Sequence, residues 1–156
     1  MNARIMQGTQ PLLYIHEDVA DSVQWRIAGD TLFLRGINTK NSTNIAVDII
    51  LPQVSSISAT ITTVEIEQIN GDSLSFCGKD HSTVAFSKTA LGQLALYLNG
   101  TSASLNGKST AVKTLIVRNG YESELKCLDL LPEVFQLPVE STFTLVASGK
   151  ALGMVK

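Results

Sequence analysis

The sequence has little of several features that would restrict its function. Its apolar runs are short, such as Ile49–Leu51, and none approaches the roughly 20 residues of a membrane-spanning helix. With 12 basic and 14 acidic residues the formal charge is −2, so there is no basic excess to bind nucleic acid. Charged residues make up 17% and hydrophobic residues 44% of the chain, which excludes wholesale disorder. A length of 156 residues predicts a single domain over residues 1–156.

Histidine and cysteine are scarce as well. The two cysteines, Cys77 and Cys127, form no CxxC pair, and two histidines are too few for a multi-histidine metal centre. Glycine-rich phosphate-binding loops are absent. The sequence therefore predicts no metal and no cofactor. The cysteine count permits one disulfide, but two free thiols in the core are the favoured interpretation.

What the sequence has instead is an internal repeat. Apolar residues recur at spacings of 20, 20, 21 and 20 residues in a series that comprises Val54, Leu74, Leu94, Leu115 and Phe135. A second series, offset by ten residues, has spacings of 20, 21, 20 and 20 and comprises Val64, Val84, Leu105, Leu125 and Leu145. One inserted residue between Leu94 and Leu105 accounts for the longer spacing in both series.

The repeat is typical of stacked strands. Many of its positions have an apolar partner two residues later, as Leu74 has Phe76, and this period places both on one face of a strand. Turn-forming pairs such as Asn70-Gly71 separate the strands. A coil of about 20 residues cannot bury its apolar face alone, so successive coils must stack with parallel strands about 4.8 Å apart. The predicted fold is therefore all-β, a parallel β-helix-like solenoid of about four to five coils over residues 51–149.

The two ends of the chain follow the repeat less well. Residues 9–50 predict an N-terminal cap of antiparallel strands, which would cover the open edge of the first coil. The expected strands are Leu12–Ile15, Val23–Ile27, Leu32–Leu34 and Ile45–Leu51, with a hairpin turn at 28–30 and a polar loop at Asn38–Asn44. The tail over residues 150–156 is expected to be loosely ordered.

Two segments of the repeat also permit a helical interpretation. Thr89–Leu98 and Leu125–Phe135 carry apolar residues at helical spacing. Gly92 and Pro132 oppose helices there. The long-range repeat favours strands in both segments.

Two clusters contain residue types that are used in catalysis or metal binding. His16-Glu17-Asp18 places an imidazole beside two carboxylates, and a solvated turn between strands is favoured over a metal or acid-base site. Asp80-His81-Ser82 contains the residue types of a catalytic triad. Three adjacent residues at a corner do not readily converge as a triad beside an oxyanion hole. We therefore expect a polar corner there.

The acidic residues of the repeat do not predict a stacked catalytic row. Enzymes that cleave polysaccharides need a pair of carboxylates that converge within several ångströms. The coil around Leu94–Lys113 has no acidic residue, which interrupts any such row. The acidic residues of the repeat region are Glu65, Glu67, Asp72, Asp80, Glu122, Glu124, Asp129, Glu133 and Glu140. We expect no enzymatic activity.

Few aromatic residues are available for sugar binding. Trp25 alternates with Val23 and Ile27 and is expected in the core. Tyr97 is out of phase with its apolar neighbours and is expected to face outward. Tyr121 lies at a predicted corner, and a patch of Tyr97 and Tyr121 is conceivable although the two are a few residues out of register.

The repeat and the segment before it resemble a known family. An aliphatic strand leads into Leu51-Pro52-Gln53-Val54-Ser55-Ser56-Ile57, and coils centred on Ser- or Thr-flanked aliphatic residues follow. The coil motifs are TTVEI, HSTVAF, SASLNG, ESELKC and FTLVASG. Over roughly Thr9 to Gly149 the chain resembles the bacterial head GIN domain family of auto-transporter adhesins. It departs from the family at Ser82-Thr83 and Glu122-Ser123, where many members have small glycine-containing pairs.

The resemblance implies a right-handed β-helical fold, export to the cell envelope and an adhesin-like role, and it supplies no catalytic residues. The expected function is a non-catalytic adhesin-like binding module in the periplasm, at the cell surface or outside the cell. The expected partner is a glycan or an envelope protein. The sequence begins without the apolar stretch of an export signal. Two interpretations of this beginning stay open: a cytosolic protein, or the exported protein that the resemblance implies, with its signal removed.

Two alternative functions stay open. One is a carbohydrate-active enzyme on a β-helical scaffold. The other is a structural unit whose uncapped end coil drives self-association into a homo-oligomer.

Overall fold

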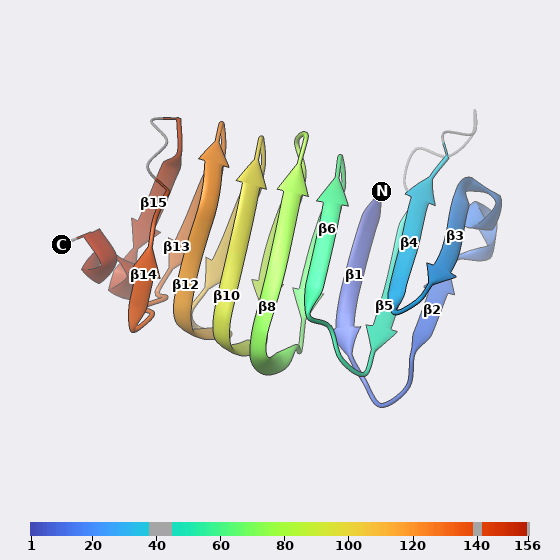
Figure 1. Cartoon of the computed structure of the whole chain (residues 1–156), viewed down its shortest axis with the longest axis horizontal. Helices are drawn as coiled ribbons and strands as arrows, with labels where there is room; N and C mark the ends of the chain where they lie inside the picture. The colour runs from blue at the N-terminus through green and yellow to red at the C-terminus, as the bar shows by residue number, and fades with distance from the viewer. Residues whose placement is uncertain (38–44, 139–141, 156) are drawn as a thin grey trace.

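The alternating apolar residues of the repeat form strands, as their period of two requires. The computed structural model describes residues 1–37, 45–138 and 142–155, with 66% of the structure in strands and 8% in helices. Parallel coils stack into a right-handed β-solenoid of about four turns (Figure 1). This confirms the predicted fold class. The polar loop predicted at 38–44 lies outside the described residues.

Two sheets form the long walls of the solenoid. The larger sheet has the order β15-β13-β11-β9-β7-β1-β5-β2, and the smaller has the order β14-β12-β10-β8-β6. The strands of the larger sheet are β1 (Asn2–Gln7), β2 (Leu12–Ile15), β5 (Ala46–Leu51), β7 (Thr63–Glu67), β9 (Thr83–Ser87), β11 (Ser102–Asn106), β13 (Glu124–Leu128) and β15 (Thr144–Ser148). The strands of the smaller sheet are β6 (Ser56–Thr60), β8 (Asn70–Lys79), β10 (Thr89–Asn99), β12 (Thr110–Tyr121) and β14 (Val134–Gln136).

Three further elements lie at the ends of the stack. A separate two-stranded hairpin of β3 (Val23–Ala28) and β4 (Thr31–Gly36) lies at the N-terminal end, as does the 3-10 helix η1 (Glu17–Ser22). The 3-10 helix η2 (Gly149–Val155) lies at the C-terminal end. Within the described part of the chain, no helix has the length and apolarity needed to cross a membrane.

The inward side chains form columns that run along the stack. The first apolar series is confirmed from Leu74 onward, because Leu74 pairs with Leu94 and Leu94 with Leu115, which in turn pairs with Phe135. The first three are at most 1% exposed. Val54 precedes β6 and is not part of this pairing. Large apolar residues therefore cover one another from coil to coil, which removes them from water.

The second apolar series is wrong at one position. Val84 pairs with Ala103 rather than with Leu105, and Ala103 pairs with Leu125. Leu105 belongs to the neighbouring column, between Phe86 and Cys127.

The single insertion that the sequence suggests is the sum of two opposite length changes, which occur at successive corners of one coil. At the first corner a single Gly100 replaces the pair Asp80-His81, which shortens the coil by one residue. At the next corner 107–109 replaces the single Lys88, which lengthens it by two. The net change is the one extra residue seen in the sequence.

The strand β1 was not predicted from the sequence. It lies between β5 and β7 and runs parallel to both, with Ala3 next to Val47 and Val64 in the register. Its partners are far away along the chain, so the local repeat contains no signal for it. Its inward residues Ala3 and Ile5 are each 7% exposed and extend the core columns toward the N-terminal end.

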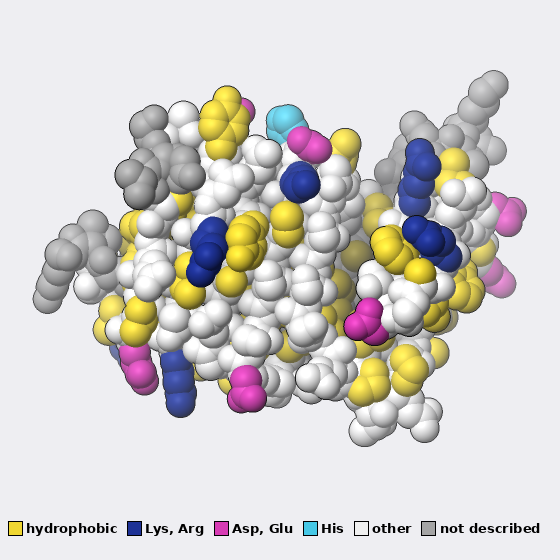
Figure 2. Space-filling view, in the orientation of Figure 1, with side chains coloured by type: hydrophobic (Ala, Val, Ile, Leu, Met, Phe, Trp, Pro, Cys, Tyr) yellow, Lys and Arg dark blue, Asp and Glu magenta, His cyan; other side chains and the backbone are white. Residues whose placement is uncertain are grey.

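The N-terminal cap agrees with the prediction in its other parts. Strand β2 pairs antiparallel with β5 at the edge of the larger sheet, and β3 and β4 form a hairpin that turns at Gly29 and Asp30. The hairpin forms a sheet of its own, and no strand of the smaller sheet lies over β1 (Figure 1). Among the residues that the structure describes, the smaller sheet therefore ends at β6 with an open edge. Its outer face carries mostly uncharged polar side chains (Figure 2).

Both helical interpretations and the expected loose tail are wrong. Thr89–Asn99 is the strand β10, and the second segment contains β13 and β14. Stacking against neighbouring strands outweighs the local helical spacing. Residues 149–155 form η2, in which Ala151 is completely buried. The tail therefore covers the last coil rather than leaving it open.

Candidate functional site

Hydroxyl groups line the inside of the corner that leads from the smaller sheet to the larger one. Ser82, Thr101 and Ser123 occupy equivalent positions there and are 1%, 2% and 4% exposed. The Ser123 Oγ donates a hydrogen bond to the Tyr121 carbonyl oxygen at 2.8 Å and accepts one from the Thr101 amide at 3.1 Å. Buried hydroxyls need such partners. The corner hydroxyls thus satisfy the backbone of their own coil and of its neighbour.

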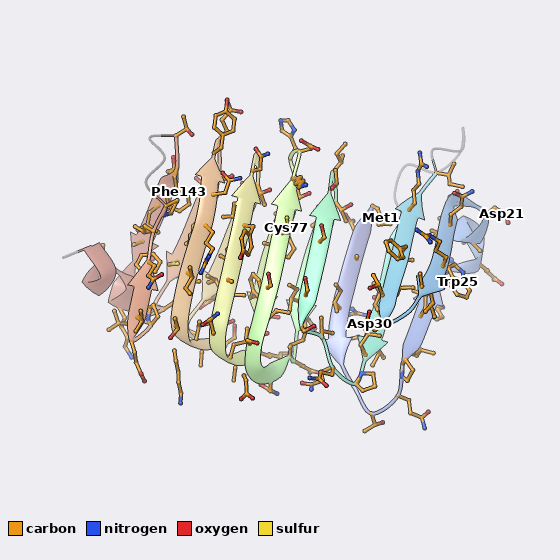
Figure 3. All side chains as sticks on the ribbon, viewed as in Figure 1. Met1, Asp21, Trp25, Asp30, Cys77 and Phe143 are labelled. Atoms are coloured by element: carbon orange, nitrogen blue, oxygen red, sulfur yellow. The ribbon has the colours of Figure 1, made fainter. Side chains whose placement is uncertain are left out.

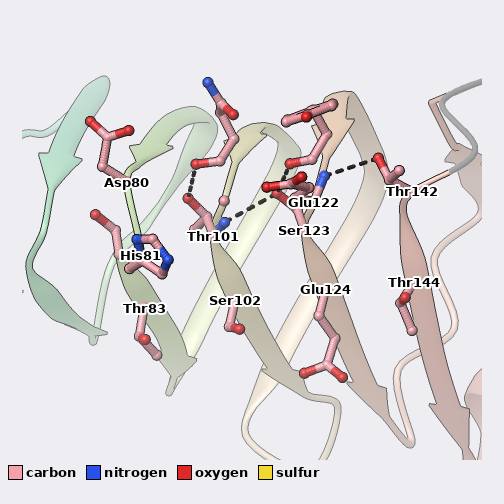
Figure 4. Close-up of a pocket in the computed structure, with 14 residues that line it drawn as sticks. Asp80, His81, Thr83, Thr101, Ser102, Glu122, Ser123, Glu124, Thr142 and Thr144 are labelled. Carbon is pink, nitrogen blue, oxygen red and sulfur yellow. Dashed lines mark hydrogen bonds between the residues drawn. The ribbon is translucent and has the colours of Figure 1, made fainter.

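The chain turns this corner through left-handed backbone conformations. Asp80, His81, Gly100 and Glu122 have φ angles of 51°, 65°, 58° and 46°. The coils are joined at this point, because the His81 amide donates to the Gly100 carbonyl at 2.7 Å and the Glu122 amide donates to the Thr142 Oγ1 at 3.0 Å. The side chains of Asp80, His81 and Glu122 project outward from the corner (Figure 4).

A shallow groove of about 550 Å³ lies beside these corner residues. Its other wall is a row of outward side chains from the first positions of four neighbouring strands, which are Thr83, Ser102, Glu124 and Thr144. At a strand spacing of about 4.8 Å this row is about 14 Å long. Figure 4 shows hydroxyl and carboxylate groups following one another across the coils. The groove thus presents polar groups at a regular spacing along the solenoid axis.

The groove carries acidic residues at both ends, with Asp80 at its N-terminal part and two glutamates at its C-terminal part. Glu122 and Glu124 line it, and the Lys126 Nζ lies 3.0 Å from the Glu124 carboxylate. A hydrogen bond to Glu122, with the charge of that carboxylate, raises the pKa of the Tyr121 phenol above its ordinary value. Tyr121 therefore remains a neutral hydroxyl group at the rim of the groove near neutral pH.

The structure places Asp80-His81-Ser82 at the polar corner, as predicted. Asp80 and His81 are exposed, whereas Ser82 is buried and its Oγ donates to the Lys79 carbonyl oxygen at 2.6 Å. The Ser82 hydroxyl is therefore engaged with the backbone rather than presented in the groove.

The His16-Glu17-Asp18 cluster caps a helix. His16 precedes η1, and its Nδ1 accepts a hydrogen bond from the Asp18 amide at 3.4 Å. The same nitrogen lies 3.3 Å from the Asp18 carboxylate, and both side chains are exposed. The prediction of a solvated connection is confirmed, with a 3-10 helix in place of a simple turn.

The acidic residues of the repeat do not form a continuous row. Asp80 and Glu122 occupy equivalent corner positions with Gly100 between them, so about 9.6 Å separates their backbones. In the described part of the chain, no group of three or more His, Cys, Asp or Glu residues could hold a metal ion. Glu140 lies outside the described residues.

The exposure of the aromatic residues agrees with the prediction for Tyr97 but not for Trp25. Tyr97 faces outward and is 38% exposed, as predicted, and Tyr121 is 51% exposed at the corner. They lie on adjacent strands but do not face each other, because Tyr97 pairs with Arg118 and Tyr121 with Asn99. Trp25 is 55% exposed on the hairpin rather than buried in the core (Figure 3). Its strand ends the stack, so no further coil covers its side chain.

Both cysteines are free. Cys127 is completely buried in a core column, whereas Cys77 is half-buried on the outer face of β8 (Figure 3). The prediction of free thiols is confirmed, but only one of the two lies in the core.

The comparisons with known proteins support the fold. No family model matches the chain, and no curated protein matches it. Among solved structures, the chain is similar to the crystal structure of a protein from Bacteroides fragilis NCTC 9343 that is described as a "putative adhesin", with a TM-score of 0.69. The alignment covers 94% of this chain and 88% of that one at 14% sequence identity. At this identity the likeness shows a common fold.

Proposed function

We propose that this chain is a non-catalytic, adhesin-like binding module of the bacterial cell envelope and a member of the head GIN domain family. The observation that carries the proposal is the fold shared along 94% of the chain with a protein described as a "putative adhesin". The coil motifs TTVEI, HSTVAF and SASLNG lie on β7, β9 and β11, which are neighbours in the larger sheet, and this supports the resemblance. The periplasm, the cell surface or the extracellular space is the proposed location.

The polar groove at the corner is the proposed contact surface for a glycan. Its row of Thr83, Ser102, Glu124 and Thr144 offers hydrogen-bond donors and acceptors about every 4.8 Å. A sugar chain has hydroxyl groups along its whole length and can lie along such a row. The groove is shallow, so binding would depend on many weak contacts along the chain rather than on one enclosed subsite.

Two features of the groove support a non-catalytic role. The Ser82 hydroxyl donates to a backbone carbonyl, and the corner carboxylates of Asp80 and Glu122 are separated by a coil that carries Gly100. An acid and a base for glycoside cleavage must instead converge on one bond.

A glycan array tests this proposal with a matched pair of variants. Thr83→Arg places a long side chain in the groove, whereas Ser73→Arg places the same side chain on the outer face of the smaller sheet. Both positions are exposed, so both variants should fold. We expect the wild type and Ser73→Arg to bind the same glycans and Thr83→Arg to lose at least tenfold in affinity.

Three results of that experiment would contradict the proposal. One is the absence of glycan binding by the wild type, and another is equal binding by both variants. The third is release of new reducing ends from a bound glycan, which would favour a carbohydrate-active enzyme.

A further inference from the structure

The outer face of the N-terminal hairpin carries positive charge from two arginines. Arg26 and Arg35 are both exposed there, although the formal charge of the whole chain is −2. Across the described ranges, neither guanidinium forms an ion pair with a carboxylate, unlike Arg4, which is paired with Asp48 at 2.7 Å. Two exposed arginines without acidic partners are free to bind an anion.

The strand register places an aromatic ring and an amide beside these arginines. Arg26 pairs with Phe33 and Gln24 with Arg35, so the four side chains share one face of the hairpin. The opposite face packs Leu32 and Leu34 against the core. Basic and hydrophobic side chains gather on this hairpin in Figure 2.

The Phe33 ring orients one of the two arginines. The Arg26 guanidinium lies over the Phe33 ring, 4.2 Å from its centroid. This stacking is favourable and leaves the N–H groups at the edge of the guanidinium free to donate hydrogen bonds. A pocket of about 700 Å³ surrounds the group, and Trp25 also lines it.

We propose that this hairpin pocket binds an anionic polysaccharide, a sugar chain that carries carboxylate or sulfate groups. The planar fork of an arginine matches the oxygens of such a group with two parallel hydrogen bonds. The aromatic face of Phe33 can pack against the C–H face of a sugar ring, and Gln24 can bind a hydroxyl group. The pocket lies on the hairpin and shares no residue with the corner groove, so this site does not depend on the proposed function of the groove.

The test measures binding of chondroitin sulfate by calorimetry at low salt. We expect the wild type to bind, and R26Q and R35Q each to lower the affinity at least tenfold. K79Q and K113Q, which remove exposed charges from the smaller sheet, should leave it unchanged. Binding should weaken as sodium chloride screens the charges. Phe33→Ala, which keeps both arginines, should lower the affinity severalfold, and thermal melting confirms that each variant is folded.

A comparison of ligands identifies which anionic group the hairpin pocket recognises. Hyaluronan carries only carboxylates and dextran sulfate only sulfates, so their relative affinities identify the anionic group, while neutral dextran should not bind. Equal binding by the R26Q/R35Q double variant, absence of binding by the wild type, or binding of poly-glutamate as tightly as of the sugar would each overturn the proposal. Thr83→Arg should still bind chondroitin sulfate, so the hairpin site and the groove can fail separately.

Discussion

Single buried hydroxyl groups determine how the coils of this solenoid are joined. An apolar residue would fill the corner position of Ser82, Thr101 or Ser123 equally well but would leave backbone groups without partners. A buried donor or acceptor that loses its partner costs about 1–3 kcal/mol. The corner hydroxyls therefore contribute more to stability than their small size suggests.

Replacement of one corner hydroxyl tests this conclusion. Ser123→Ala removes the acceptor for the Thr101 amide and should lower the free energy of unfolding by about 1–3 kcal/mol in urea denaturation. Ser102→Ala changes an exposed hydroxyl on the adjacent strand and should change it by less than about 0.5 kcal/mol. Equal effects would show that the Ser123 hydrogen bonds contribute nothing.

Because the thiol of Cys127 is buried, the stability of the fold decreases at alkaline pH. Burial raises its pKa from 9.0 to about 12, because the thiolate is poorly solvated in the core. The unfolded chain therefore releases this proton from pH 9 upward, while the folded chain keeps it until about pH 12. The contribution of the protonated Cys127 to stability is therefore complete below pH 9. As the pH rises from 9 toward 12 this contribution is lost, and the free energy of unfolding falls by up to about 1.4 kcal/mol per pH unit.

Comparison with Cys127→Ala isolates this effect. Chemical denaturation of both proteins between pH 8 and pH 11 should show a steeper loss of stability for the wild type than for the variant. The variant lowers stability at every pH by leaving a small cavity, so the slope is the informative quantity. Parallel curves would contradict the raised pKa.

Among the elements, η2 acts as a cap for the last coil. It follows β15 directly, and Ala151 is completely buried whereas the adjacent Leu152 is 61% exposed. A solenoid needs such a cap because its last coil has no neighbour on one side.

A charged residue placed under η2 tests how much this cap contributes to the stability of the fold. Ala151→Asp buries a carboxylate and should lower the free energy of unfolding by about 3 kcal/mol, whereas Leu152→Asp should be nearly neutral. Thermal melting and urea denaturation measure both. If the two variants were equally stable, η2 would not be docked on the last coil.

The sequence predicted those elements whose neighbours in space are one repeat away. The columns of Leu74 and Leu94 were evident because their spacing is regular, and the hairpin was evident from its turn residues. Strand β1 could not be predicted, because a strand pairs with whichever partner completes the sheet and its partners begin at Ala46 and Thr63. Ala103 was missed because two opposite length changes in one coil appear as a single change in the sequence.

The candidate site was only partly predictable. The sequence indicated the polar corner at Asp80 and His81, but not that Ser82 turns inward while Thr83 turns outward. Hydroxyl residues recur before the strands at Thr62, Ser82, Thr101 and Ser123, and this recurrence is the signal that would have found the corner. The exposure of Trp25 could not be predicted, since it depends on where the stack ends rather than on the alternation along its strand.

At the scale of the whole molecule, one continuous core unites the coils and the N-terminal cap. Its central columns contain Leu94 and Leu125, which are both 0% exposed. A charge in a column removes apolar contacts from two neighbouring coils as well as from its own. A single buried charge should therefore destabilise several coils of the stack.

Leu94→Asp and Leu125→Asp should each abolish folding. The lost packing and the buried unpaired charge together cost about 5–10 kcal/mol, which is comparable with the total stability of a domain of this size. Gln93→Asp, at the exposed position next to Leu94, should melt like the wild type. Circular dichroism measures all three, and a normal melting curve for either leucine variant would show that the columns are not continuous.

The place of β1 in the larger sheet also has a consequence for biosynthesis. This strand has no partner until residues 46–51 have been made, and its second partner, residues 63–67, follows later. At about 5–20 residues per second, the 44 positions from Asn2 to its first partner Ala46 require about 2–9 seconds of translation. The nascent chain must therefore hold β1 unpaired throughout that interval, and the sheet closes around β1 only after β5 and β7 have been made.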